Sequence, residues 1–301
     1  MLKRLELVYI VTIFMFIITV VLVLYTMERE QEYKTHQNDI QKTVIEGAAY
    51  AINLQLENKR RHVHLFIDEY SKALSRLYNN PDDETTENSL RNRLQQRFTD
   101  FFTYTITDLD GVHQFLDIDS RVGNACQVDL DNFAKKIKNN QSGVRNAIFV
   151  HPQAFHYHYD IMVPMQVNTQ NHGDNRKIFF ASFYLNEITD ILKTHEVPGQ
   201  KLMLTRQSDP GLIEVTREGS RDKLSRNSRL SPEEILNISA HKNIPATDWR
   251  LISLQDKSYE QRYISKLWKE VVIILIIVGI ALLLLIVILI KLTSRHRINH
   301  D

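Results

Sequence analysis

Residues 271–290 read VVIILIIVGIALLLLIVILI and contain no charged side chain. Residues 7–27 read LVYIVTIFMFIITVVLVLYTM, so two apolar runs bracket the chain. At about 1.5 Å of rise per residue, a helix of about 20 residues matches the roughly 30 Å hydrocarbon core of a bilayer. The two runs therefore predict two membrane-spanning helices.

Alternative interpretations of the two runs fit less well. A cleaved secretory signal has an apolar core of about 7–15 residues and a small-residue cleavage site. The first run is longer than that and ends in Tyr25, Thr26 and Met27. A core helix of a soluble domain keeps a polar face, which the second run lacks. We therefore expect an uncleaved anchor and a second span.

The charges beside the spans predict the orientation of the chain, because Lys and Arg next to a span favour the cytoplasmic side. Basic residues flank the outer ends of both runs, namely Lys3, Arg4, Lys291, Arg295 and Arg297. Lys266 and Lys269 also precede the second span, but Trp268 and Glu270 accompany them. We expect a two-pass protein of a bacterial inner membrane with both termini in the cytoplasm and residues 28–270 in the periplasm.

The composition excludes some classes of function. The chain has 37 Lys and Arg against 36 Asp and Glu, a formal net charge of +1, which gives no electrostatic reason to expect a nucleic-acid partner. Cys126 is the only cysteine, so an internal disulfide is impossible, which favours a bacterial periplasm over a eukaryotic surface. The sequence contains no phosphate loop, no Gly-x-Ser-x-Gly elbow, no His-Glu-x-x-His and no kinase signature. We expect neither an enzyme nor a cofactor.

A long stem helix should follow the first span. Apolar residues recur at helical spacing over residues 35–78, with a possible break near Asn58, and the sequence NNPDD at 79–83 stops the pattern. The outer half should lie on a domain core. The half nearest the membrane could pair with a second copy, which predicts a homodimer.

Strand and turn signals fill the rest of the outer segment. Asp110-Gly111 predicts a hairpin between 101–107 and 112–118, and a helix should contain Leu130 and Ile137. Further strands are expected at 147–151, 155–167 and 178–185, before a short helix at 185–192. A smaller second unit follows, with strands at 201–206, 212–217 and 249–254, a helix that starts at Ser231-Pro232, and a helix at 258–269 that enters the second span.

This order resembles the Cache domains, the extracytoplasmic PAS-like sensors of bacterial receptors. The phrases that carry the resemblance are ITDLDG at 106–111 and DWRLI at 248–252. The resemblance implies an α+β fold in which PAS-like antiparallel sheets sit on a long stem helix between two transmembrane helices. The implied segments are 1–27, 28–98 (stem and connection), 99–192 (distal PAS-like domain), 193–270 (membrane-proximal unit), 271–290 and 291–301. The ligand signature of the amino-acid-binding members is not matched.

The sequence FHYHYD at 155–160 holds a candidate metal site. Side chains alternate along a strand, so His156, His158 and Asp160 share one face, and His113, His151 or His172 might complete a site. An alternative is that the two histidines lie on a half-wet sheet face or pack under the stem helix. A third is that they sense pH, because an unperturbed histidine titrates near 6.5.

A small-molecule pocket is a further hypothesis. Its apolar wall would come from Tyr104, Phe149, Tyr157 and Tyr159, and a carboxylate would be held by Arg121 or Arg145. The alternative places the aromatic side chains in the core and the arginines on the surface.

These observations together predict a sensor. We expect the periplasmic domain to bind a small ligand or a periplasmic protein and to signal through its transmembrane helices to a separate or missing cytoplasmic output domain, with membrane lipid as a further contact. The alternative is a structural assembly protein resembling the polysaccharide co-polymerases, which regulate chain length. Two-span channel subunits, a third class, usually carry a disulfide-rich outer domain, and one cysteine argues against them.

Overall fold

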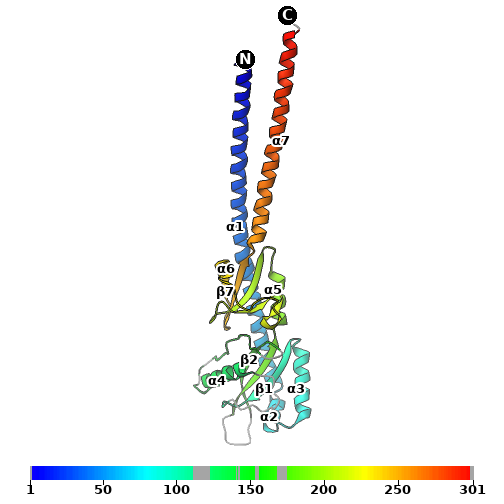
Figure 1. Cartoon of the computed structure of the whole chain (residues 1–301). Helices are drawn as coiled ribbons and strands as arrows, with labels where there is room; N and C mark the ends of the chain where they lie inside the picture. The colour runs from blue at the N-terminus through cyan, green and yellow to red at the C-terminus, as the bar shows by residue number, and fades with distance from the viewer. Residues whose placement is uncertain are drawn as a thin grey trace. The chain divides into compact units, whose positions relative to one another are not determined.

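The computed structural model describes residues 2–110, 123–139, 141, 143–152, 156–167 and 175–298. The chain divides into two compact units, one made of Met1–Ile40 with Asp256–Asp301 and the other of Gln41–Gln255. Figure 1 shows the whole chain, with its two long helices and its two sheets. Each unit is described separately below.

The first unit consists of the start of α1 (Leu2–Glu69) and helix α7 (Lys257–Ile298). Both helices are long and apolar enough to cross a membrane. Their apolar side chains are exposed; Phe16 is 69% and Leu283 64% accessible. So continuous an apolar surface is not stable in water, and the two helices are consistent with a two-pass membrane protein. Within this unit the rings of Tyr33 and Tyr263 stack at 4.0 Å between centroids.

The second unit is built on the remainder of α1. From residue 41 onward this helix buries one side, with Ala48, Ile52 and Phe66 all inaccessible to solvent. The helix runs through Asn58 without interruption and ends at Glu69, so the predicted break near Asn58 is wrong. Packing of the apolar side outweighs the modest helix preference of one asparagine. Helix α2 (Ser71–Asn79) follows directly.

Helix α3 (Glu84–Arg97) was not predicted from the sequence. Asp83 caps it by accepting a hydrogen bond from the Thr86 backbone N–H at 3.0 Å, so the stop signal at 79–83 also begins a helix. Its Leu90 and Leu94 are buried in the core that also contains Phe66 of α1.

The first sheet has three described strands in the order β1-β3-β2, all antiparallel. These strands are β1 (Phe101–Thr107), β2 (His158–Gln166) and β3 (Arg176–Tyr184). Helix α4 (Asn124–Lys138) packs Phe133 against Met162 and Phe180 on one face of the sheet. The strand expected at 112–118 lies outside the described residues.

The second sheet has five strands in the order β6-β5-β4-β8-β7. Its strands are β4 (Gln200–Arg206), β5 (Ile213–Thr216), β6 (Gly219–Ser220), β7 (Ile238–Asn243) and β8 (Trp249–Gln255). Strands β6 and β7 were not predicted. The remaining elements are α5 (Asn186–His195), the short helix η1 (Arg221–Lys223) and α6 (Pro232–Leu236). The predicted helix start at Ser231-Pro232 is confirmed, and Ser231 and Glu234 form a capping box there.

The two sheets and α1 share one hydrophobic core. It contains Phe179 of the first sheet, Leu204 and Trp249 of the second, and Ile52 of α1, and Figure 1 shows both sheets beside this part of α1. The backbones of the two parts also join, because Asp248 donates its N–H to the carbonyl oxygen of Ile148 at 2.8 Å. The α+β fold with antiparallel sheets on a long stem helix is therefore confirmed.

Candidate functional site

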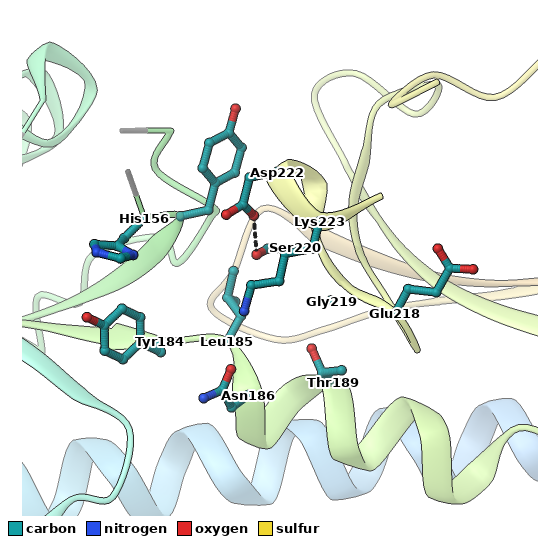
Figure 2. Close-up of a pocket in the computed structure, with 11 residues that line it drawn as sticks. His156, Tyr184, Leu185, Asn186, Thr189, Glu218, Gly219, Ser220, Asp222 and Lys223 are labelled. Atoms are coloured by element: carbon teal, nitrogen blue, oxygen red, sulfur yellow. Dashed lines mark hydrogen bonds between the residues drawn. The ribbon is translucent and has the colours of Figure 1, made fainter. Parts of the chain in front are cut away.

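A cavity of about 270 Å³ lies where side chains of the two sheets meet. The first sheet contributes the residues just before β2 and those at the end of β3 and the start of α5, while the second contributes the turn from β5 to β6 and helix η1. The lining residues, shown in Figure 2, are His156, Tyr157, Tyr184, Leu185, Asn186, Thr189, Glu218, Gly219, Ser220, Asp222 and Lys223.

The cavity carries charges of both signs. Figure 2 shows the Lys223 side chain extending toward Leu185. Ser220 donates its hydroxyl to the Asp222 carboxylate at 2.5 Å, and this bond holds the acid at the rim. Gly219 has a φ of +137°, and a Cβ there would lie 2.9 Å from the Lys223 Cδ. Glycine is therefore needed both for the backbone turn and for the position of the lysine.

Aromatic groups form the other wall of the cavity. The His156 ring meets the Tyr184 ring edge-on at 5.6 Å. The guanidinium of Arg221 lies 5.2 Å from the centre of the Tyr157 ring, within the range of a cation–π contact. This contact runs from helix η1 to the segment before β2, so it joins the two parts that line the cavity.

A second candidate site is a buried polar cluster between β2 and α4. His158 and Asp160 on β2 are inaccessible to solvent, and Cys126 in the first turn of α4 is 1% accessible. The Cys126 Sγ lies 3.3 Å from the His158 Nε2, which lies 3.6 Å from the Asp160 Oδ1. His151, also inaccessible, places its Nε2 3.4 Å from the Asp160 Oδ2. The three side chains Cys126, His158 and Asp160 can hold a metal ion, because their ligand atoms all lie within 4.8 Å of one another.

Burial controls ionisation in this cluster. It lowers the pKa of His151 to about 4, so the imidazole is neutral at pH 7. It also raises the pKa of Asp129 to about 7, with a further contribution from the negative charge of Asp160. The pKa of the Cys126 thiol is raised as well, first by burial and then by Asp160. Burial therefore disfavours the charged forms of Asp129 and Cys126.

Some residues of the predicted metal site come together and others do not. His158 and Asp160 share one face of β2, as the alternation predicts, and His151 joins them. The expectation of a half-wet face is wrong for His158, which lies fully buried beneath α4. His156 is exposed and lines the cavity instead. His113 and His172 lie outside the described residues.

The residues predicted for a ligand pocket are dispersed. Tyr104 and Tyr159 are core side chains with 1% and 0% accessibility. Arg145 is exposed and forms an ion pair with Glu57 at 2.7 Å. The remaining three lie elsewhere: Tyr157 in the cavity wall, Phe149 stacked on His151 at 4.0 Å, and Arg121 outside the described residues.

Sequence reasoning missed several residues of both sites. Cys126 and Asp129 form a Cys-x-x-Asp pair within the first two turns of α4, and pairing this motif with the His-x-Asp of β2 was the available signal. The cavity residues Ser220 and Lys223 lie in β6 and η1, and no local sequence pattern predicts that they line a cavity.

Two arginines connect the second sheet to the segment that carries His151. Arg206 on β4 and Arg221 of η1 both donate to the carbonyl oxygen of Val150, at 3.1 and 3.4 Å. Behind them lies Glu214 of β5, which is inaccessible to solvent and lies 2.6 Å from the Arg206 Nε. Arg221 thus contacts Tyr157 of the cavity wall as well as Val150, the residue before His151.

No protein-family model matches the chain. The search of curated proteins also gives no match. Solved structures do resemble it. The sensor domain of the V. cholerae histidine kinase DctB is 10% identical with a TM-score of 0.48, over 73% of this chain and 97% of that chain. The sensory domain of the Campylobacter jejuni chemoreceptor Tlp3, with isoleucine bound, is 11% identical with a TM-score of 0.47, over 76% and 96%.

The ligand-binding domain of the Pseudomonas aeruginosa PAO1 amino acid chemoreceptor PctB, in complex with L-Gln, is 14% identical with a TM-score of 0.45, over 74% of this chain and 92% of that chain. These three structures are sensor or ligand-binding domains of two chemoreceptors and of a histidine kinase.

Proposed function

We propose that this chain is the sensory part of a bacterial inner-membrane receptor, whose periplasmic domain binds a small ligand and signals through its two transmembrane helices to a cytoplasmic output domain or partner. The observation that carries the proposal is the construction of the cavity from both sheets. A ligand there touches both parts of the outer domain at once, so its binding energy can depend on how they are arranged.

The second sheet offers a short path from the cavity to the membrane. Cavity residues Gly219 and Ser220 form β6, and the sheet order continues through β5 and β4 to β8. Strand β8 ends at Gln255 and α7 begins at Lys257, so only Asp256 separates the sheet from the second apolar helix. A shift of this sheet therefore acts on α7 through the covalent chain.

The cavity fits a small zwitterion. Lys223 can pair with a carboxylate, and Glu218 or Asp222 can pair with an ammonium group, while Tyr157 and Tyr184 supply apolar surface. The volume of about 270 Å³ is just below the usual range of about 300–1,000 Å³ for ligand pockets. An amino acid combines the required charges and size, and amino acids occupy similar domains of other receptors.

We also propose a homodimer that pairs along α1. Tyr50, Leu54 and Leu65 are large apolar side chains with 68%, 43% and 53% exposure. At about 100° per residue these positions fall within a sector of about 60° on one side of the helix. A second copy would cover this stripe.

Thermal unfolding of the full chain in lipid nanodiscs tests the ligand proposal. Each of the twenty protein amino acids is added separately, and at least one should raise the unfolding temperature with a saturable dose dependence. Lys223→Met should weaken that ligand at least tenfold. Lys201→Met, which changes an exposed lysine of β4 away from the cavity, should leave binding unchanged. The proposal fails if no amino acid shifts the transition or if the two variants behave alike.

A further inference from the structure

We propose that the buried cluster between β2 and α4 binds one divalent transition-metal ion of the zinc class, through Cys126, His158, Asp160 and His151. The site is separate from the cavity, and its failure would leave the proposed ligand site intact. It also differs from the metal site predicted from sequence, because Cys126 replaces His156.

The spacing of the Cys126, His158 and Asp160 donor atoms matches three corners of a tetrahedral metal site. Zinc forms bonds of about 2.0 Å to imidazole nitrogen or carboxylate oxygen and about 2.3 Å to sulfur, so two ligands of one tetrahedral ion lie about 3.3–3.5 Å apart. The Cys126–His158 and His158–Asp160 separations are 3.3 and 3.6 Å. The His151 Nε2 lies 3.4 Å from the other carboxylate oxygen of Asp160.

Several buried polar atoms of this cluster have no hydrogen-bond partner among the described residues. Both ring nitrogens of His151 and the Asp160 Oδ2 are buried without a hydrogen-bond partner among the described residues. The Asp129 Oδ2, which lies 3.9 Å from the His151 Nε2, is also buried without a hydrogen-bond partner among the described residues. Buried polar atoms without partners are costly, and a cation bound by His151 and Asp160 would satisfy the two atoms that face each other.

The surrounding groups already orient the ligands. The His158 Nδ1 lies 3.2 Å from the carbonyl oxygen of His156, so its N–H can donate there and leave the Nε2 lone pair facing Cys126. Ser182 donates its hydroxyl to the Asp160 Oδ1 at 2.6 Å. Hydrogen bonds of this kind fix the tautomer and rotamer of metal ligands.

The donor set selects the class of ion. One sulfur, two imidazole nitrogens and a carboxylate suit zinc or cobalt, whereas calcium and magnesium prefer oxygen ligands alone. Cys126 lies in the first turn of α4 and supplies the sulfur ligand. Binding would release the thiol proton to solvent and form the metal–sulfur bond.

Metal binding would fix the segment that carries His151. The preceding residue, Val150, accepts the hydrogen bonds of Arg206 and Arg221 from the second sheet. A bound ion would therefore hold the first sheet, α4 and this contact in one arrangement. Loss of the ion would free His151 and loosen the contact.

Cobalt binding to the full chain in detergent tests the proposal directly. After chelation of bound metal, Co²⁺ should bind at one equivalent per chain and give a thiolate-to-cobalt charge-transfer band, which an equivalent of Zn²⁺ should remove. Cys126→Ser should abolish the band, and Asp160→Asn should weaken binding at least tenfold. His241→Asn, at an exposed histidine of β7 that lines neither candidate site, should bind as the unmodified protein does.

Three results would overturn the inference. The first is the absence of stoichiometric binding with a charge-transfer band in the unmodified protein, and the second is a loss of binding in His241→Asn equal to that in Cys126→Ser. Direct zinc analysis of the unmodified protein, with affinity measured against a chromophoric chelator, needs no variant. Less than half an equivalent of zinc after loading would also contradict the proposal, even if the variants fail to fold.

Discussion

The Arg206 Nη2 lies 3.1 Å from the carbonyl oxygen of Val150, and this hydrogen bond joins the second sheet to the segment beside the buried cluster of Cys126, His158 and Asp160. The same guanidinium pairs with Glu214, which is inaccessible to solvent. Because Arg221 also donates to Val150, the two arginines form a small bridge between the parts of the outer domain. The bridge places the second sheet one residue from His151 of the buried cluster.

Removing Arg206 should destabilise the outer domain. Arg206→Met leaves Glu214 buried with only the more distant Arg221, whose Nε lies 3.6 Å away, so we expect a loss of about 2–4 kcal/mol in the free energy of unfolding. Arg229→Met is the control, because its ion pair with Asp209 is exposed and should be worth less than about 1 kcal/mol. Urea unfolding in nanodiscs compares the two, and equal losses would contradict the role of the bridge.

Lys59 should anchor the stem helix to the first sheet. Its amino group pairs with Asp100 and Glu187, and the lysine and Asp100 are only 4% and 2% accessible. Lys59→Met leaves a buried carboxylate without its cation, which should cost about 3–5 kcal/mol of unfolding free energy. Adding Asp100→Asn should recover part of that loss. An unchanged loss in the double variant would show that packing, rather than charge, is responsible.

Acid should weaken the cap of α6 in a defined range. The hydrogen bond from Arg226 lowers the pKa of Glu234 from 4.5 to about 2, so its ionised form stabilises the fold above pH 4.5 and this contribution is lost as the pH falls from 4.5 to about 2. Glu234→Gln should therefore lower the urea midpoint at pH 7 by more than at pH 2. The effect at pH 7 should stay below about 1 kcal/mol, because the pair is partly exposed. Glu233→Gln is the matched control, and an equal effect of Glu234→Gln at both pH values would contradict the assignment.

The exposed stripe on α1 should hold the dimer together. Leu54→Glu places a charge in the middle of the stripe and should weaken dimerisation at least tenfold, measured by mass photometry of the full chain in nanodiscs or detergent. Leu236→Glu, at an 85% exposed leucine of α6, is the matched control and should leave the mass unchanged. A large ring instead of a dimer would favour the assembly-protein alternative.

Periodicity in the sequence predicted the features that depend on side-chain direction within one helix or strand. The alternation in FHYHYD correctly separated Tyr159, in the shared core, from His158 and Asp160 on the opposite face. Helical spacing located α4 and the stem, and the Ser-Pro-Glu-Glu signal located α6. In each case the signal lies within one element, where side-chain direction follows from backbone geometry.

Tertiary placement accounts for the misses. The sequence around Cys126 does not predict that this side chain of α4 lies close to β2, because that contact depends on how the helix crosses the sheet. Strand β7 is mostly exposed, so its sequence ISAHKN lacks the apolar alternation of a half-buried strand. The residues around Gly219 line the cavity only because residues of the first sheet lie against them.

The most direct test of the receptor proposal measures how fast a disulfide forms between α1 and α7 in the first unit. Tyr33→Cys and Tyr263→Cys replace the two stacked rings, while Cys126 is buried and can stay in place. The disulfide formation rate is measured in nanodiscs with and without the amino acid that most raises the unfolding temperature. If occupancy of the cavity moves the transmembrane helices, the rate should change at least twofold and Lys223→Met should remove the change. A saturated cavity with an unchanged rate would contradict the proposal.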